Sequence, residues 1–270
     1  MKVAILGCGP AGLLAAHAAK LCGHQVRIFS RKRRSPMAGA QYMHVEIPDL
    51  RLPDPAMIEY KLIGTVAGYR EKVYGSGDPD VVVSPEQFLG SHKCWDLRLT
   101  YSRLWHRWDP VIANIMIDQV ALYQLSQSFD IIISTIPAQV LCENPEEHQF
   151  KYVPVWIDNM WSGPIPAELP GAWENPNLVI CNGVPIDQNV ERTGWYRTSH
   201  IYGHMNTEWT RESVVPENRG KPPGHVWKVR KPISTNCTCW PNIIRAGRYG
   251  LWQKGVLTHH AYEQAMMVLS

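Results

Sequence analysis

The sequence of 270 residues lacks several patterns that would each have defined a class of protein. No apolar run reaches the roughly 18 residues that span a bilayer, so we expect no transmembrane helix. The seven cysteines are odd in number and contain no Cys-x-x-Cys pair, so neither a secreted disulfide framework nor a metal site is expected. Cys237 and Cys239 are interpreted as two reduced thiols in a strand.

A strong overall charge is also missing. The net charge is only +3, which excludes a globally basic nucleic-acid coat but not a local basic patch. The first residues, Met1 to Leu6, could form the start of a signal peptide, but glycines interrupt the apolar stretch at once. The apolar stretch is more typical of a buried strand. Because no targeting segment is then left, we expect a cytoplasmic protein. With 45% hydrophobic and 19% charged residues, the chain can build a packed core.

A nucleotide-binding pattern occupies the first 30 residues. An apolar strand at residues 3–6 is followed by a Gly-x-Gly-x-x-Gly turn, a helix at residues 13–21 rich in small side chains, and a second strand at residues 26–29. The first glycine permits the tight turn, the second leaves the backbone open to a pyrophosphate, and the third lets the helix pack against the sheet. Amides at the helix start would face the phosphates. The residues predicted to bind them are Gly7, Gly9, Pro10, Ala11 and Gly12.

The position that normally holds the adenosine ribose carries Ser30 instead of an acidic residue. Serine can still form a hydrogen bond to a ribose hydroxyl, but without charge assistance. Arg31 and Lys32 follow, and basic residues there also suit a 2′-phosphate. This position therefore leaves two interpretations open: FAD with a weakened ribose contact, or NADP.

Three segments together resemble the FAD-dependent oxidoreductases, a class that includes flavin monooxygenases, amine oxidases and UDP-galactopyranose mutases. The first is the glycine turn with its Pro10-Ala11 pair. The second is the small-residue stretch 35–41. The third comprises a strand at residues 242–246, a Gly-Arg turn and a helix from about Gly255 to Leu269.

The resemblance implies an α/β fold: a Rossmann-like, doubly wound FAD-binding domain built from both chain ends, with an inserted antiparallel β-rich substrate domain. The turn at Gly247 would touch the diphosphate, and the start of the last helix would face the flavin ring. The strand at residues 111–115 would lie at the adenine side. The strand at residues 129–138 would end at the edge of the cofactor. The further residues expected at the cofactor are Gly39, Ala40, Gln41, Ile115, Thr135, Pro137, Gly247, Arg248, Trp252, Gly255, Val256 and Leu257.

The predicted domain boundaries follow from this arrangement. Residues 1–42, 110–142 and 240–270 form the FAD-binding domain, and residues 43–109 and 143–239 form the substrate or cap domain. Within the cap, residues 62–74 read as two strands around a glycine turn. Residues 198–204 alternate, so that His200, Tyr202 and His204 are expected on one strand face. A second Gly-x-Gly-x-x-Gly is missing, so we expect no separate NAD(P)H domain.

Candidate catalytic groups are chosen for their chemistry, because none lies in a motif that assigns a role. Histidine moves protons near neutral pH, and arginine holds a phosphate or carboxylate. Flavin performs the difficult chemistry itself, so few protein groups are needed. The candidates are His44, Tyr196, Arg197, His200, Tyr202 and Arg245.

These observations favour an FAD-dependent oxidoreductase acting on a small or nucleotide-like, anionic substrate. Between residues 211 and 254 basic side chains outnumber acidic ones, with Trp227 and Trp240 among them, which suits phosphates and bases or a nucleic acid. Compact flavoproteins of tailed bacteriophages, some of which take part in DNA base modification, are similar in layout, so lyase chemistry on a modified base stays open. Two further alternatives are an NADP-dependent reductase and a non-catalytic nucleotide- or DNA-binding protein.

Overall fold

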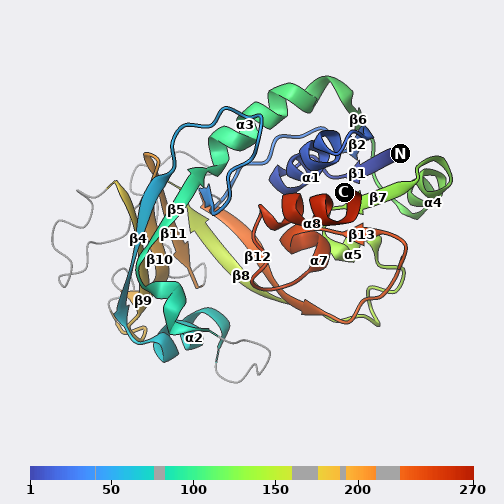
Figure 1. Cartoon of the computed structure of the whole chain (residues 1–270). Helices are drawn as coiled ribbons and strands as arrows, with labels where there is room; N and C mark the ends of the chain where they lie inside the picture. Colours follow the sequence, from blue (N-terminus) through green and yellow to red (C-terminus); the bar gives the residue numbers. More distant parts are fainter. Residues whose placement is uncertain (40, 76–82, 160–175, 189–192, 211–225) are drawn as a thin grey trace.

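The computed structural model describes residues 1–39, 41–75, 83–159, 176–188, 193–210 and 226–270. Within these ranges the chain forms two sheets, which lie at opposite ends of the molecule in Figure 1. One has five strands in the order β13-β7-β1-β2-β6, and the other has eight in the order β12-β8-β11-β10-β9-β4-β5-β3. None of the helices in these ranges combines the length and the apolar character needed to cross a membrane.

The five-stranded sheet is parallel and has β1 at its centre. β1 pairs with β2 on one side and with β7 on the other, and its residues from Val3 to Leu6 are fully buried. A strand covered on both faces needs such a continuous apolar run. The elements of this half are β1 (Lys2–Leu6), α1 (Pro10–Leu21), β2 (Gln25–Ser30), η2 (Asp109–Val111), β6 (Ile112–Asn114), α4 (Gln119–Ser128), β7 (Ile131–Ser134) and α5 (Ala138–Leu141).

The end of the chain returns to this sheet. β13 (Ile244–Arg245) pairs in parallel with β7, and α7 (Gly247–Leu251) follows. The last helix, α8 (His260–Leu269), lies beside α1 in Figure 1, and Ala261 and Ala265 share the core of α1. Both chain ends therefore build one parallel α/β unit. The predicted helix from Gly255 starts later, at His260, because residues 255–259 form a turn-containing loop.

A long helix from the middle of the sequence also packs here. α3 (Leu97–Trp108) lies against α1, and its Leu104 is fully buried in the same core. The hydroxyl of Tyr101 donates to the carbonyl of Cys8, 3.2 Å away, in the glycine turn. Residues 43–109 were predicted to belong to the cap domain. Helix α3 lies within this range, yet it packs on α1 and contacts the nucleotide-binding turn.

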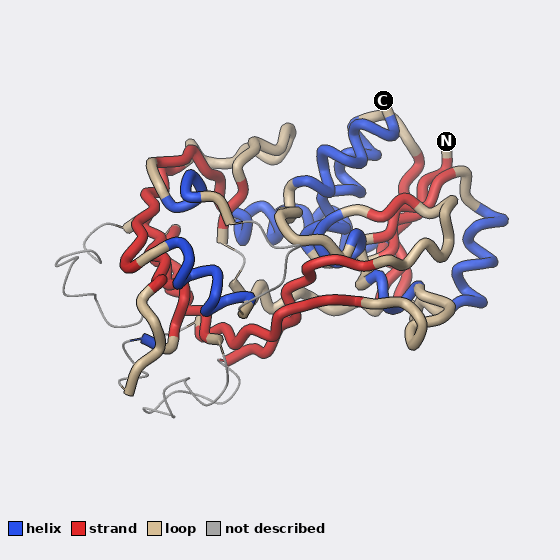
Figure 2. The backbone as a smooth tube through the Cα atoms, turned by 90° about the horizontal axis from the view of Figure 1, so that it is seen from below, coloured by secondary structure: helices blue, strands red, loops and turns tan. Residues whose placement is uncertain are grey.

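The eight-stranded sheet is antiparallel except where β4 and β9 pair in parallel. Its long strands β8 and β12 run side by side from this sheet towards the parallel one, as Figure 2 shows. The elements are β3 (Tyr42–Met43), β4 (Ala56–Gly64), α2 (Val66–Tyr74), η1 (Pro85–Phe88), β5 (Ser91–Asp96), β8 (Phe150–Asp158), β9 (Asn177–Gly183), β10 (Trp195–Ile201), β11 (His204–Trp209) and β12 (Val226–Thr235).

Two expectations for this half are wrong. Residues 62–74 are not two strands, because β4 ends at Gly64 and the helix α2 begins after Thr65. The Thr65 hydroxyl accepts the Gly68 amide hydrogen at 3.0 Å, which is an N-cap bond. Gly68 lies against the Gly183 carbonyl, where a Cβ would come within 2.0 Å, so the helix packs directly on β9.

The second wrong expectation concerns the alternating segment 198–204. Tyr202 and Gly203 both have positive φ angles, 52° and 74°, and form a two-residue hairpin turn. His204 starts the next strand and pairs with Ile201, whereas His200 pairs with Met205. The chain reverses direction before the alternation is complete, so the three side chains do not share one strand face.

Candidate functional site

The glycine turn between β1 and α1 is shaped by two close contacts and one opening. Gly7 has a φ of 107°, and a Cβ there would lie 2.7 Å from the Thr135 hydroxyl. At Gly12 a Cβ would lie 2.0 Å from the Gly7 carbonyl oxygen. Gly9, in contrast, has no heavy atom within 4 Å of its Cβ position. Packing therefore requires the first and third glycines, while the second borders open space.

The start of α1 faces that opening without a cap of its own. Gly9 is the N-cap residue, Pro10 occupies the first turn, and no side chain forms a cap hydrogen bond. The first turn also contains no acidic residue. An uncapped helix start offers amide donors and a partial positive charge, which is the arrangement that binds a diphosphate.

The C-terminal block reaches this turn. Gly247 has a φ of 71°, and a Cβ there would lie 2.9 Å from the Ala11 Cβ. Its amide donates to the Gln264 side chain at 3.0 Å, which ties the turn to α8. Arg248 Nε donates to the Val256 carbonyl at 2.9 Å and so links α7 to the loop that follows it. Gly247 thus lies beside the glycine turn, and Arg248 follows it in the chain.

The loop before α8 is the expected flavin position. Gly255 has a φ of 80° and no heavy atom within 4 Å of its Cβ position, so the backbone is open there. Val256 is buried, and the Leu257 amide donates to His260 Nδ1 at 3.1 Å. The loop is therefore held by the first residue of α8 while one side of it stays accessible.

Two of the predicted cofactor residues have other surroundings. Trp252 is 1% exposed, and its indole nitrogen donates to the Lys151 carbonyl at 3.0 Å. Its ring packs on Phe150, so it fixes α7 to β8 and does not line the open edge. Pro137 is exposed and precedes α5.

The ribose position has a local hydrogen-bond network. The Ser30 hydroxyl donates to the Arg31 carbonyl at 3.2 Å, and the Ile115 amide donates to the Ser30 carbonyl at 3.0 Å. Lys32 Nζ lies 3.2 Å from the Asp109 carboxylate. Lys32 is therefore paired with an acidic neighbour, and both side chains are partly exposed.

The small-residue stretch connects the nucleotide site to the antiparallel sheet. Gly39 has a φ of 71°, and a Cβ there would lie 2.9 Å from the Ile157 side chain. Gln41 is buried, donates to the His204 carbonyl at 2.8 Å and accepts from the Ser199 hydroxyl at 2.6 Å. Ala40 lies outside the described residues. Gly39 and Gln41, the two predicted residues of this stretch that the structure describes, therefore both pack on the antiparallel sheet.

A buried charge cluster, consisting of Glu208, Arg197, Lys231 and Tyr196, lies beneath Gly39. The Glu208 side chain is 1% exposed and bonds to Arg197 and to Lys231. Lys231 Nζ also donates to the Tyr196 hydroxyl at 2.8 Å. Burial by itself would raise the pKa of Glu208, but the two cations outweigh it and lower this pKa to about 2. The cluster therefore contains two positively charged side chains and one negatively charged side chain.

A histidine cluster joins this sheet to the start of α8. The His44 ring lies 5.8 Å from that of His92 and 5.8 Å from that of His259, which in turn lies 4.6 Å from His260. Burial, followed by the neighbouring His92 and His260, lowers the pKa of His44. Burial, with His260 and His44, lowers the pKa of His259 to about 4. Both rings are therefore neutral at neutral pH.

The structure gathers only some of the predicted catalytic residues. Tyr196 and Arg197 belong to the buried charge cluster, and His44 belongs to the histidine cluster. Tyr202 donates to the Cys94 carbonyl and accepts the Ala56 amide at 3.1 Å, which anchors the hairpin turn. His200 is half-buried, and its Nδ1 has no hydrogen-bond partner among the described residues.

Sequence reasoning missed Glu208, His92 and the two histidines at the start of α8. Each is a single polar residue in a stretch without a motif, and only the fold brings these residues together. The adjacent pair His259-His260 was the one visible signal, at the start of the predicted last helix.

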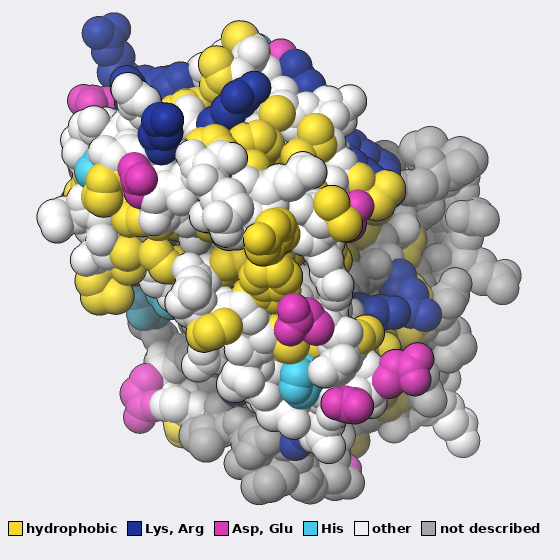
Figure 3. All heavy atoms as spheres, turned by 90° about the vertical axis from the view of Figure 1, so that its right-hand side faces the viewer, with side chains coloured by type: hydrophobic (Ala, Val, Ile, Leu, Met, Phe, Trp, Pro, Cys, Tyr) yellow, Lys and Arg dark blue, Asp and Glu magenta, His cyan; other side chains and the backbone are white. Residues whose placement is uncertain are grey.

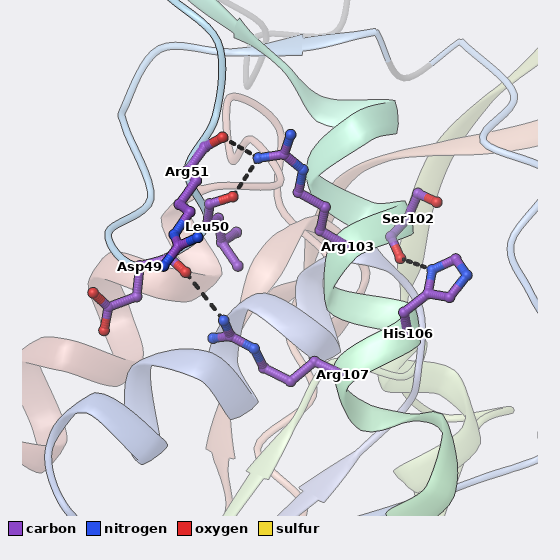
Figure 4. Close-up of a pocket in the computed structure, with 7 residues that line it drawn as sticks. All are labelled: Asp49, Leu50, Arg51, Ser102, Arg103, His106 and Arg107. Carbon is purple, nitrogen blue, oxygen red and sulfur yellow. Dashed lines mark hydrogen bonds between the residues drawn. The ribbon is translucent and has the colours of Figure 1, made fainter.

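A surface pocket of about 780 Å³ lies elsewhere, between α3 and the loop 49–51 (Figure 4). Its arginines bond to backbone carbonyls. Arg103 donates to Leu50 and Arg51, and Arg107 donates to Asp49 at 3.0 Å. These bonds fix a loop in which Asp49 and Arg51 have positive φ angles. The pocket is thus explained by loop anchoring, away from the glycine turn.

No protein-family model and no curated protein matches this chain. Solved structures do. HpxO from Klebsiella pneumoniae, complexed with FAD and uric acid, is 11% identical with a TM-score of 0.52, over 100% of this chain and 79% of that one. The p-nitrophenol 4-monooxygenase PnpA from Pseudomonas putida is 12% identical with a TM-score of 0.50, over 99% and 80%. A redesigned putrescine oxidase is 9% identical with a TM-score of 0.51, over 99% and 97%. The chain therefore has the fold of these three proteins, which confirms the predicted α/β, Rossmann-like fold class.

Proposed function

We propose that this chain is an FAD-dependent oxidoreductase. The observation that carries the proposal is the meeting of both chain ends: Gly247 lies against Ala11 at the uncapped start of α1, next to the opening at Gly9. The diphosphate would bind at Gly7 to Gly12 and at Gly247. The shared fold with FAD-containing structures supports the same assignment.

FAD would supply the transfer of a hydride or of single electrons. The chain's own residues position it. The loop from Gly255 to Leu257 leaves one backbone face open for the ring, and the start of α8 adds a partial positive charge that favours negative charge nearby. The side chain of Gln41 fixes the end of the small-residue stretch to the antiparallel sheet.

The buried charge cluster supports the proposal of an anionic substrate. Arg197 and Lys231 share a single carboxylate, and their side chains keep 28% and 19% of their surface exposed. The excess positive charge would attract a carboxylate, a phosphate or an acidic heterocycle. Tyr42 and Tyr60, whose hydroxyls are in contact, add an aromatic wall suited to a planar molecule.

His44 is our candidate for the proton acceptor. Its ring contacts Tyr42 and lies between the substrate sheet and the loop before α8. Because burial lowers its pKa, the ring is neutral near pH 7 and is able to take a proton from a substrate.

The basic segment gives less support to a nucleic-acid substrate. Lys228 lies over the Trp156 ring and Arg230 over the Tyr152 ring, at 4.9 and 4.8 Å. Residues 211–225 of the segment lie outside the described residues. On the face shown in Figure 3, basic and acidic side chains occur together. We therefore favour a small or nucleotide-like anion, and DNA base modification remains a proposal that rests on the similar layout alone.

The test of the cofactor site is Gly9→Glu. The Cβ position of Gly9 is open, so the side chain fits the fold but places a carboxylate where the diphosphate would lie. We expect a folded, colourless protein. Gln25→Glu, which adds the same charge at an exposed position on β2, should keep the yellow cofactor. Unchanged cofactor content in Gly9→Glu would contradict the proposed site.

A further inference from the structure

Four sulfur- and nitrogen-bearing side chains meet at the junction between the two sheets. Their ligand atoms, three thiol sulfurs and one imidazole nitrogen, all lie within 4.8 Å of one another. This thiol–histidine cluster consists of Cys142, His148, Cys237 and Cys239.

The sequence shows no such site, because no Cys-x-x-Cys pair is present. The four residues come from two loops, and Cys239 and His148 are 91 positions apart. The two thiols of the Cys-x-Cys segment were expected in a strand. β12 ends at Thr235 instead, and both thiols lie in the loop that follows.

The distances suit tetrahedral coordination. The His148 Nδ1 atom lies 3.1 Å from Cys142 Sγ and 3.6 Å from Cys239 Sγ. In a tetrahedral zinc site, with bonds of about 2.3 Å to sulfur and about 2.0–2.1 Å to nitrogen, neighbouring ligand atoms are about 3.6–3.8 Å apart. Small side-chain rotations would therefore place a single ion at bonding distance from all four atoms.

The cysteines are not used in another way. All three are free thiols in the structure, and Cys142 and Cys237 are buried. Three buried or half-buried thiols beside one imidazole form a soft donor set, and such a set selects zinc over calcium or magnesium.

A positive group also stands beside the cluster. Arg245 Nη2 lies 3.4 Å from Cys237 Sγ and 2.8 Å from the Cys239 carbonyl, to which it donates. A zinc ion with three thiolates and a neutral imidazole carries one net negative charge. The arginine would balance that charge and orient the loop, as outer hydrogen bonds do in metal sites.

We propose that the thiol–histidine cluster binds one Zn²⁺ as a closed structural site. All four positions are supplied by protein side chains, so none is left for a substrate or for catalytic water.

The position of the cluster indicates which part of the fold the ion would stabilise. Cys142 directly follows α5, and His148 precedes β8, where the chain leaves the parallel sheet. The loop with Cys237 lies where the chain returns, between β12 and β13. A hydrogen bond from the Gln149 amide to Asn236 Oδ1, 2.8 Å long, also joins the two loops. The ion would fasten both crossings between the nucleotide sheet and the substrate sheet.

The test measures metal in the full-length protein, purified without added metal. Mass spectrometry of the elements should find about one zinc per chain in the wild type, and less than about a tenth of that in Cys142→Ser and Cys239→Ser. Cys22→Ser, whose half-buried thiol contacts Met266, is the matched control and should keep its zinc. His148→Cys keeps four soft ligands and should also keep it.

A second measurement uses the wild-type protein, so the proposal can be tested even if the variants fail to fold. Protein produced with Co²⁺ in place of zinc should show the intense thiolate-to-cobalt absorption and the visible bands of tetrahedral coordination. Three outcomes would overturn the proposal: a folded wild type without zinc whose cysteines in the cluster react freely with a thiol reagent, a disulfide within the cluster, or iron bound in place of zinc. The flavin content is read separately, so failure of the FAD proposal leaves this result unaffected.

Discussion

The carboxylate of Glu208 shows how a single residue can organise the candidate substrate site. It is buried, and it neutralises one of the two cations that face it. Without it, Arg197 and Lys231 would repel each other across the sheet, and the Tyr196 hydroxyl would lose one of its hydrogen-bond partners.

Glu208→Gln should therefore destabilise the fold. We expect a loss of about 2–3 kcal/mol in the free energy of unfolding, at the low end for a broken buried pair because both cations keep some contact with water. Urea denaturation at neutral pH measures it. The pKa of Glu208 is lowered from 4.5 to about 2, so its contribution is present above about pH 4.5 and is lost as the pH falls through about 2. The variant should lack this acid dependence, and a variant as stable as the wild type would contradict the assignment.

Single residues also mark the limit of sequence reasoning. Gly7, Gly9 and Gly12 were predictable because their spacing reflects contacts within one turn, and the structure shows those contacts. Glu208 and His92 were not, because their significance comes from partners that are distant in the sequence. Their sequence neighbours carry no information about those partners.

At the scale of elements, helix α2 replaces a predicted strand. The β-branched and aromatic residues of 62–74 favour a strand, but Thr65 caps a helix and Gly68 lets that helix approach β9 closely. Sequence periodicity could not reveal this approach, because it depends on a glycine more than a hundred positions away, Gly183.

Thr65→Ala should lower the stability by about 1 kcal/mol through loss of the cap hydrogen bond. Chemical denaturation measures the change. Ser84→Ala is the matched control, since Ser84 precedes the short helix η1 without a cap bond from its side chain and should change little. Equal effects of the two substitutions would show that the Thr65 hydroxyl does not act as a cap.

The histidine cluster at the start of α8 predicts a dependence on pH. The pKa of His259 is lowered from 6.5 to about 4, so the unfolded chain binds a proton that the folded chain does not. Stability should be highest above about pH 6.5 and should fall as the pH decreases towards 4. His259→Gln should flatten this part of the curve, whereas His106→Gln, exposed on α3, should leave it unchanged. If the stability of His259→Gln and that of the wild type changed with pH in the same way, His259 would not be the source of the pH dependence.

At the scale of the whole molecule, the fold joins residues from both ends of the chain. The N-terminal strand, turn and helix were predicted closely, because each element has a local signal. The return of the chain was predicted from a resemblance, and β13 and α8 confirm it by pairing with β7 and packing on α1. The junction loops carried no recognisable pattern, so the thiol–histidine cluster emerged only from the structure.

The joining of both ends around one flavin is the central claim, and the cofactor released from the native protein tests it most directly. The purified chain, denatured and examined by mass spectrometry and absorption, should release FAD in about equal molar amount to the protein. A native, folded protein that releases no flavin and instead binds NADPH would contradict the account.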